Sequence, residues 1–243
     1  MIDELQPQAV IFSDGGPGCR WVGNEHGFAG ATNWSFLRAG EVYPGYPKYR
    51  ELQYGHADGN QWVAAECDVS IRPGWFYHPE EDDRVKTVDE LTDLYYRSVG
   101  HNATLLLNFP VDRDGLIHPT DSANAVNFHQ NVQKQLAHNL LAGLSPKASD
   151  ERGRTFSAKA VTDGDYDTYW ATNDDVISAT IEFDLPQAEK INRMMLQEYI
   201  PLGQRVKSFV VEYNQAGEWL PVNLSHTFHK RLPEQLNIVR TLK

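Results

Sequence analysis

Strand-like and helix-like patterns alternate through the first 143 residues of the chain. Three continuous apolar runs predict buried β-strands, at residues 9–13, 62–67 and 104–109. Strands that are apolar on both faces and are connected through a helix are typical of a parallel sheet covered on both sides. Three such strands are too few for a closed barrel of parallel strands, which needs about eight.

Two helices are predicted in the same part of the chain. Residues 87–100 place apolar side chains at helical spacing. Thr87 and Glu90 form a capping-box signature at the start of this helix, and Gly100 is a typical residue for its end. A second, longer helix is predicted from about Asp121 to Leu141. The first part of the chain is therefore expected to be α/β.

The pattern changes after residue 144. Short segments of alternating polarity follow one another, separated by turn residues, at residues 178–185, 191–200, 206–214 and 218–224. Such spacing is typical of an antiparallel β-sandwich. We therefore predict two domains, residues 1–144 and residues 145–243.

Composition excludes several classes of function. The 243 residues carry a net charge of −11, which argues against a nucleic-acid partner because no basic surface is predicted. The two cysteines, Cys19 and Cys67, are too few for a disulfide framework or a zinc site, and both are expected to be small buried side chains. No apolar run reaches the length of a membrane span, and no segment assigns a cellular location.

Polar and aromatic residues follow each predicted strand, where parallel α/β proteins place their active sites. The first such loop carries Arg20 and Glu25, and the second carries Glu66, Arg72 and Trp75. Carboxylates, arginines and tryptophans at one edge suit a sugar, because an indole covers the apolar face of a pyranose. Glycosidic cleavage commonly uses two carboxyl groups, one of which donates a proton.

Glu25 fits the proton donor because Trp21, Val22 and Gly23 precede it and could shelter a protonated carboxyl. Each candidate also has a plainer interpretation. Glu25 could be a surface residue, Glu66 could form a structural ion pair with Arg72, and Trp75 could be a core anchor. The histidines have no metal-ligand spacing, so metal catalysis is disfavoured.

A second candidate site lies in the predicted sandwich. The run from Asp163 to Trp170, DGDYDTYW, is dense in oxygen ligands. It could form a structural Ca²⁺ loop, or simply a series of Asx turns. No other cofactor is expected.

Two long stretches resemble one enzyme family. The run AVIFSDGGPGCRWVGNEHGFAGATNWS and residues 62–121, which begin WVAAECDVSIRPGWFYHP, resemble glycoside hydrolase family 29, the α-L-fucosidases. The likeness is greatest to the subfamily that cleaves α-1,3/1,4-linked fucose from Lewis-type glycans. Residues 146–224, which include KASDERGRTFSAKAVTDGDYDTYWAT, resemble the discoidin-like (factor 5/8 type C) sandwich. The resemblance implies the C-terminal portion of a (β/α)8-type barrel followed by that sandwich.

The resemblance also implies a retaining exo-α-L-fucosidase and gives each residue a role. The glutamate of RWVGNE is the acid/base, which is Glu25 here. Arg20 is expected to contact fucose, and Trp75 to lie against its apolar side. Glu66 and Arg72 would line the fucose subsite or the adjoining one. The partners implied are fucosylated oligosaccharides or glycoconjugates, and the family commonly acts in the periplasm or outside the cell.

One family feature is missing from the sequence. The family nucleophile is an aspartate in a WFDG-type motif on an earlier strand, and no such motif occurs here. We therefore expect no nucleophile in this chain and no activity of the chain alone, as in a fragment whose sandwich is also incomplete. Two alternatives stay open. The chain could be a carbohydrate-binding module on a non-catalytic barrel remnant, or an inverting hydrolase that pairs Glu25 with Glu66.

Overall fold

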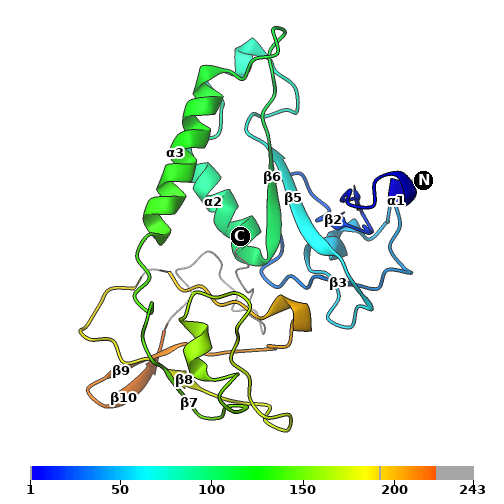
Figure 1. Ribbon diagram of the computed structural model, residues 1–243. Coiled ribbons are helices and arrows are strands. Elements are labelled where there is room, and N and C mark those ends of the chain that lie inside the picture. The colour runs from blue at the N-terminus through cyan, green and yellow to red at the C-terminus, as the bar shows by residue number, and fades with distance from the viewer. Residues whose placement is uncertain (1, 192, 223–243) are drawn as a thin grey trace. The chain divides into compact units, whose positions relative to one another are not determined.

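The computed structural model describes residues 2–191 and 193–222 (Figure 1). The chain divides into two compact units. One comprises the described residues up to Val132 together with those from Val206 onward, and the other comprises Gln133–Arg205. The domain boundary predicted after residue 144 stays a prediction.

The first unit is built on a four-stranded parallel sheet with the strand order β1-β2-β5-β6. Its strands are β1 (Phe12–Ser13), β2 (Cys19–Trp21), β5 (Ala64–Ser70) and β6 (Ala103–Asn108). The sequence predicted three strands, so β2 is an addition, and the first predicted run forms a strand only at its end. Arg20 therefore lies within a strand, and the prediction that placed it in a loop was wrong.

A tight turn explains why the sequence pattern concealed β2. The backbone N–H groups of Gly18 and Cys19 both donate to the Ile11 carbonyl, at 3.0 and 3.1 Å. A side chain at Gly18 would meet the Ile11 backbone nitrogen at 2.6 Å, so only glycine fits there. The chain thus turns back within a few residues and begins β2 directly.

The two faces of the sheet differ in burial. Along β5, Ala65, Cys67 and Val69 are buried, whereas the alternate residues Glu66 and Asp68 are half-buried. On β6, Leu106 pairs with Asp68 and is 43 % exposed. The expectation that both faces are covered was therefore wrong, because one face carries carboxyl groups and is partly open.

Helices α2 (Val88–Ser98) and α3 (Pro119–Leu136) cover the other face (Figure 1). The predicted capping box is confirmed, since Thr87 accepts from the Glu90 backbone N–H and the Glu90 carboxylate accepts from the Thr87 N–H. After α2 a 3-10 turn, η3 (Val99–His101), continues to Asn102, whose φ is 58°. The second helix begins two residues before its predicted start and ends five residues before its predicted end.

Among the described residues, three apolar clusters form the core of this unit. The largest joins the sheet to both helices and contains Val69, Ile71, Val85, Leu91 and Leu94, with Leu105, Leu107, Phe109 and Phe128 packed against it. The other two lie around Leu37 and around Val22. The shorter elements are α1 (Ile2–Leu5), β3 (Phe36–Leu37), η1 (Tyr49–Gln53), β4 (Gln61–Trp62) and η2 (Pro79–Glu81), and β3 pairs antiparallel with β4.

The C-terminal part has less regular structure than the sequence predicted. Its strands form two antiparallel pairs, β7 (Lys147–Ala148) with β8 (Ile181–Glu182), and β9 (Glu212–Gln215) with β10 (Glu218–Pro221). The described residues there also form the 3-10 turns η4 (Ala158–Val161) and η5 (Ile200–Leu202). The predicted strand at 191–200 is absent among the residues described there. The predicted end of the last strand, residues 223–224, lies outside the described residues.

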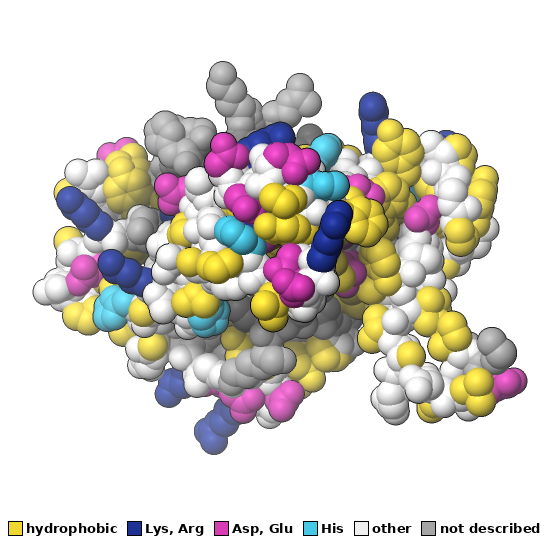
Figure 2. All heavy atoms as spheres, turned by 90° about the horizontal axis from the view of Figure 1, so that it is seen from above, with side chains coloured by type: hydrophobic (Ala, Val, Ile, Leu, Met, Phe, Trp, Pro, Cys, Tyr) yellow, Lys and Arg dark blue, Asp and Glu magenta, His cyan; other side chains and the backbone are white. Residues whose placement is uncertain are grey.

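Charged side chains of both signs are mixed on the surface. Figure 2 shows Lys and Arg side chains dispersed among acidic, histidine and apolar ones on the face that it presents. In the described part of the chain, no helix is long and apolar enough to cross a membrane.

Candidate active site

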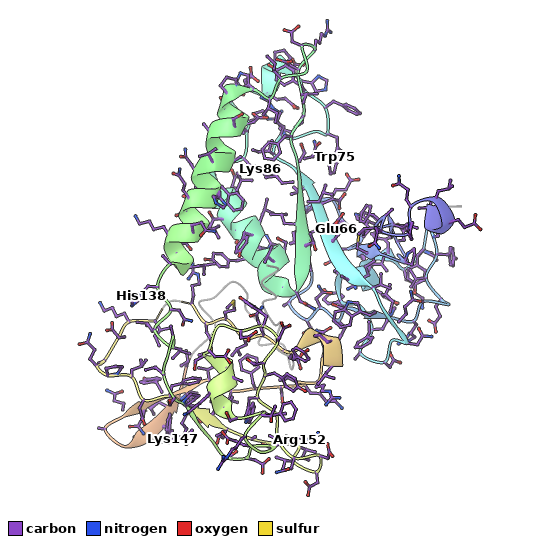
Figure 3. The ribbon with its side chains drawn as sticks, viewed as in Figure 1. Glu66, Trp75, Lys86, His138, Lys147 and Arg152 are labelled. Carbon is purple, nitrogen blue, oxygen red and sulfur yellow. The ribbon has the colours of Figure 1, made fainter. Side chains whose placement is uncertain are left out.

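Two loops meet at the carboxyl end of the parallel sheet. Glu25 follows β2 by four residues, and Trp75 follows β5 by five. The indole Nε1–H of Trp75 donates to the Glu25 carboxylate, with an Nε1–Oε2 distance of 2.8 Å. Figure 3 shows Trp75 beyond the end of β5 and Glu66 along the strand. The structure thus brings together two predicted site residues that are 50 positions apart.

The Trp75 backbone is held by the neighbouring strand. The Asn108 side chain, at the end of β6, donates to the Trp75 carbonyl and to the Ser70 hydroxyl, both at 3.1 Å. Trp75 is half-buried, so part of its ring stays open to solvent. The alternative of a fully buried core anchor therefore does not describe this tryptophan.

Glu25 lies in a loop that its neighbours fix. Asn24 accepts from the His26 N–H at 2.9 Å and donates to the Phe28 carbonyl at 3.1 Å. Gly23 has a φ of +77°, and a side chain there would come within van der Waals overlap of the Tyr49 carbonyl. Val22 is fully buried, but Glu25 itself is exposed. The predicted apolar shelter for Glu25 was therefore wrong, because Val22 packs into the core.

Glu66 lies within β5 rather than in a loop. It pairs in register with Trp21 of β2 and with Thr104 of β6. The Cys19 thiol lies 3.7 Å from the Glu66 carboxylate. Burial, with a further contribution from the Glu66 charge, raises the pKa of Cys19 to about 11. Glu66 is therefore a half-buried carboxylate on the open face of the sheet.

Asp68 is the residue that sequence reasoning left without a role. It accepts a hydrogen bond from the Trp21 indole at 2.9 Å. Burial raises its pKa, and the charges of Glu25 and Glu66 raise it further, whereas the Trp21 hydrogen bond opposes this. The signal was present in the sequence, because Glu66 and Asp68 are two residues apart and a strand places such residues on one face.

Arg20 was predicted to contact sugar, and its surroundings contradict this prediction. Its side chain is fully buried and its guanidinium donates to the chain itself. The acceptors are the carbonyls of Leu52, Val63 and Trp34 and the side-chain oxygen of Asn33, at 3.0, 2.5, 2.8 and 2.6 Å. Burial lowers the pKa of Arg20 to about 10, so it stays charged at neutral pH. Arg20 therefore links β2 to the segments that contain Leu52, Val63 and Asn33.

Arg72 is also turned into the protein, against the prediction that it lines a sugar subsite. Its guanidinium forms a double hydrogen bond with Asp121 of α3, at 2.8 and 2.9 Å, and neither side chain is exposed. A second carboxylate, Asp82, lies 2.9 Å away. The pKa of Arg72 is raised, mainly by the hydrogen bond to Asp121. The suggested pair of Arg72 with Glu66 is thus replaced by a pair with Asp121.

Among the described residues, no group of three or more His, Cys, Asp or Glu side chains is arranged to hold a metal ion. In the Asp163 loop, Asp163 accepts from the Asp165 N–H and Asp165 from the Asp167 N–H, both at 2.9 Å. Thr168 donates to the other oxygen of Asp163 at 2.6 Å. These are the Asx turns of the plainer interpretation, and the calcium loop stays a prediction.

Known proteins are similar to this chain in sequence and in fold. Residues 145–237 match the model of the F5/8 type C domain. Alpha-L-fucosidase 1 of Arabidopsis thaliana is 38 % identical over 256 residues, which cover 100 % of this chain and 49 % of that protein. Putative alpha-L-fucosidase 1 of Oryza sativa subsp. japonica is 41 % identical, over 87 % of this chain and 41 % of that protein.

Solved structures of α-L-fucosidases are similar to this chain as well. A candidate α-L-fucosidase of Bacteroides thetaiotaomicron has a TM-score of 0.87 at 39 % identity, covering 97 % of this chain and 51 % of its own. A Ruminococcus gnavus GH29 fucosidase, solved with fucose, has a TM-score of 0.78 at 32 % identity, over 88 % of this chain and 44 % of its own. The chain spans about half the length of the relatives it matches. By sequence and by fold, it belongs to the glycoside hydrolase family 29 α-L-fucosidases and carries a discoidin-like domain.

Proposed function

We propose that this chain supplies the acid/base side of a retaining exo-α-L-fucosidase site that acts on α-1,3/1,4-linked fucose. Glu25 is the acid/base, Trp75 forms the apolar wall beside fucose, and Glu66 accepts hydrogen bonds from sugar hydroxyls. The observation that carries the proposal is the 2.8 Å hydrogen bond between Trp75 and Glu25 at the carboxyl end of the sheet. Arg20 and Arg72 have no direct role in it, because both guanidinium groups are buried and paired.

The geometry suits the two protonation states that an acid/base must adopt. Glu25 is exposed, so a glycosidic oxygen can approach the carboxyl and take its proton. After the leaving group departs, the same carboxylate can accept a proton from water. The Trp75 indole holds one carboxylate oxygen, which leaves the other for the substrate. The half-buried Trp75 ring offers an apolar surface for the C–H face of the sugar.

In our proposal, this chain lacks the catalytic nucleophile. Retaining hydrolysis needs a second carboxylate that attacks the anomeric carbon, about 5–5.5 Å from the acid/base. The family motif that provides it does not occur in the sequence. We therefore expect sugar binding at Trp75 without turnover by the 243-residue chain.

Two measurements test this proposal. Titration of the chain with L-fucose or a Lewis-type trisaccharide should shift the Trp75 indole N–H signal in a ¹⁵N NMR spectrum. The Trp75→Phe variant identifies this signal, and Trp219→Phe, at an exposed tryptophan of β10, is the matched control. The trisaccharide should release no fucose. If neither sugar shifts the Trp75 indole N–H signal, the proposed site is refuted. Release that disappears in Glu25→Ala would show that the chain has its own nucleophile.

A second candidate function is glycan binding by the discoidin-like domain. It is supported by the match to the F5/8 type C domain. It is also supported by a group of aromatic rings, in which the ring centroid of Tyr169 lies 4.3 Å from that of Tyr199, in a stacked arrangement, and 4.9 Å from that of Phe156. The same titration, extended to galactose-containing sugars, tests it. Shifts confined to residues 145–222 would support a binding module, and shifts confined to the Trp75 region would exclude one for these sugars.

A further inference from the structure

A small cavity lies beside the amino end of β6, within the first unit. Its volume is about 220 Å³. Its described walls come from the segment after β2, the end of η1, the last turn of α2 and η3, and they comprise Phe28, Ala29, Gly30, Ala31, Gln53, Tyr54, Arg97 and His101. His101 is two residues before the first residue of β6, whereas Glu25 and Trp75 meet at the carboxyl end of the sheet.

Backbone hydrogen bonds hold the walls of this cavity in place. The Ala29 N–H donates to the Arg97 carbonyl and the Gly30 N–H donates to the Gln53 carbonyl, both at 3.0 Å. A side chain at Gly30 would meet the Tyr54 ring at 2.4 Å, so this ring lies directly against the backbone. The walls are therefore largely preformed, as is usual for sites that bind small molecules.

Arg97 brings to the cavity a cation with an unused hydrogen-bonding edge. Its Nη1 atom lies 3.4 Å from the carboxylate of Asp93, one helical turn earlier. Its guanidinium lies over the Phe28 ring, with Cζ 4.0 Å from the ring centroid. Its Nε atom is buried and has no hydrogen-bond acceptor in the part of the chain that the structure describes. A buried N–H without an acceptor is costly, so a ligand oxygen at this edge would be stabilising.

A carboxylate is the group that best fits this edge of Arg97. The Nε and one terminal nitrogen of a guanidinium can donate two parallel hydrogen bonds to the two oxygens of a carboxylate. Most of the other walls are apolar, since Phe28, the two alanines and the Tyr54 ring line the same space. A cavity of about 150 Å³ in another protein holds a benzene ring. The 220 Å³ available here is therefore enough for a six-membered ring that carries a carboxylate.

We propose that this cavity binds a small carboxylate carried on a six-membered ring, with the carboxylate on the Nε edge of Arg97 and the ring among the apolar walls. Sugar acids and aromatic acids share this chemistry. The net charge of −11 repels anions at long range, so the affinity has to come from contacts inside the cavity. The inference is independent of the proposed fucosidase site, because neither Glu25 nor Trp75 is among the described residues that line the cavity.

NMR titration of the whole chain tests this proposal with two acids and their uncharged counterparts. D-glucuronate is compared with D-glucose, and benzoate with benzyl alcohol. At least one acid should shift the Arg97 Nε–H signal and the Gly30 amide signal to saturation, whereas the neutral compounds should leave the Arg97 signal unchanged. A response to one acid alone identifies the ligand as a sugar acid or an aromatic acid, and a response to both supports the shared chemistry. If neither acid shifts these signals, or if the neutral compounds bind equally well, the inference is wrong.

Variants assign the effect to the cavity. Arg97→Lys keeps the positive charge but removes the edge with two donors, so it should weaken binding of the acid by about tenfold. Ala31→Leu fills part of the cavity and should also weaken binding, which provides a second test if Arg97→Lys does not fold. Arg38→Gln, at an exposed arginine paired with Asp58, should leave the affinity unchanged. Full affinity in folded Arg97→Lys or Ala31→Leu, or an acid that shifts the Trp75 signal instead of the Arg97 signal, would overturn the inference.

Discussion

The pair formed by Arg72 and Asp121 is the contact whose loss should destabilise the first unit most clearly. Both side chains are fully buried and their two hydrogen bonds measure 2.8 and 2.9 Å. Asp121→Ala leaves a buried guanidinium without its main partner. Breaking such a pair costs about 3–5 kcal/mol in free energy of unfolding. Asp82, which is 35 % exposed and 2.9 Å from the same guanidinium, compensates in part. We therefore expect a loss of about 3 kcal/mol.

The assay is urea denaturation of the chain, followed by tryptophan fluorescence and by far-UV circular dichroism. Replacing both partners, as in Arg72→Met with Asp121→Leu, should recover most of the loss, because an apolar pair needs no compensation. The exposed pair of Arg38 with Asp58 provides the control, since Asp58→Asn should have a small effect that added salt removes.

The effect of Asp121→Ala on the candidate site can be measured from the Trp75 indole N–H signal. Arg72 lies between β5 and Trp75, and Asp121 lies in the first turns of α3. Asp121→Ala should therefore loosen the loop that presents Trp75 and shift its indole signal. A loss below about 1 kcal/mol, with an unchanged Trp75 signal, would refute the argument that this buried pair fixes the loop.

Three further changes test separate parts of the structure. Gly23→Ala should destabilise the first unit strongly in urea, because its Cβ would overlap the Tyr49 carbonyl and its φ is +77°; an unchanged midpoint would contradict the described turn. Thr87→Ala should cost about 1 kcal/mol in the same assay through loss of the capping box with Glu90, and full retention of stability would count against it. Burial raises the pKa of Asp68 above its ordinary value of 3.8, so the folded state binds this proton more tightly than the unfolded state does. The free energy of unfolding should therefore fall as the pH rises above 3.8 through the pKa of Asp68 in the folded protein. Asp68→Asn should flatten that part of the profile, and an identical profile in the two proteins would show that Asp68 is not perturbed.

Local signals predicted local structure well. The capping box of Thr87 and Glu90 is confirmed because both partners lie within one helical turn. The last apolar run became β6 with a boundary shift of one residue at each end. The three-residue strand β2 was missed because a segment this short carries no alternation pattern of its own, and only its pairing with β1 and with β5, more than 40 residues further along the chain, makes it a strand. Nothing within Cys19–Trp21 distinguishes a short strand from a loop.

Only part of the candidate site was predicted, because its geometry depends on contacts between residues that are far apart in the sequence. A side chain's type indicates what it can bind, but its direction depends on partners that are distant in sequence. Arg20 and Arg72 were assigned to sugar from the family resemblance, yet Arg20 donates to acceptors 13 to 43 residues away and Arg72 donates to Asp121, 49 residues away, inside the fold. Asp68 was grouped with the polar residues after the second predicted strand but was given no role, because only the pairing of β2 with β5 places it beside Trp21.

The two buried arginines support the two loops of the candidate site from inside the protein. Arg20 joins β2 to the segments around Leu52 and Val63, immediately before the loop that carries Glu25. Arg72 joins the loop that carries Trp75 to α3. An exposed carboxylate can have a reproducible position only if its supporting chain is rigid, and charged hydrogen bonds in the interior are costly to break. The hydrogen bond between Trp75 and Glu25 is therefore the meeting point of two loops, each fixed by its own buried cation.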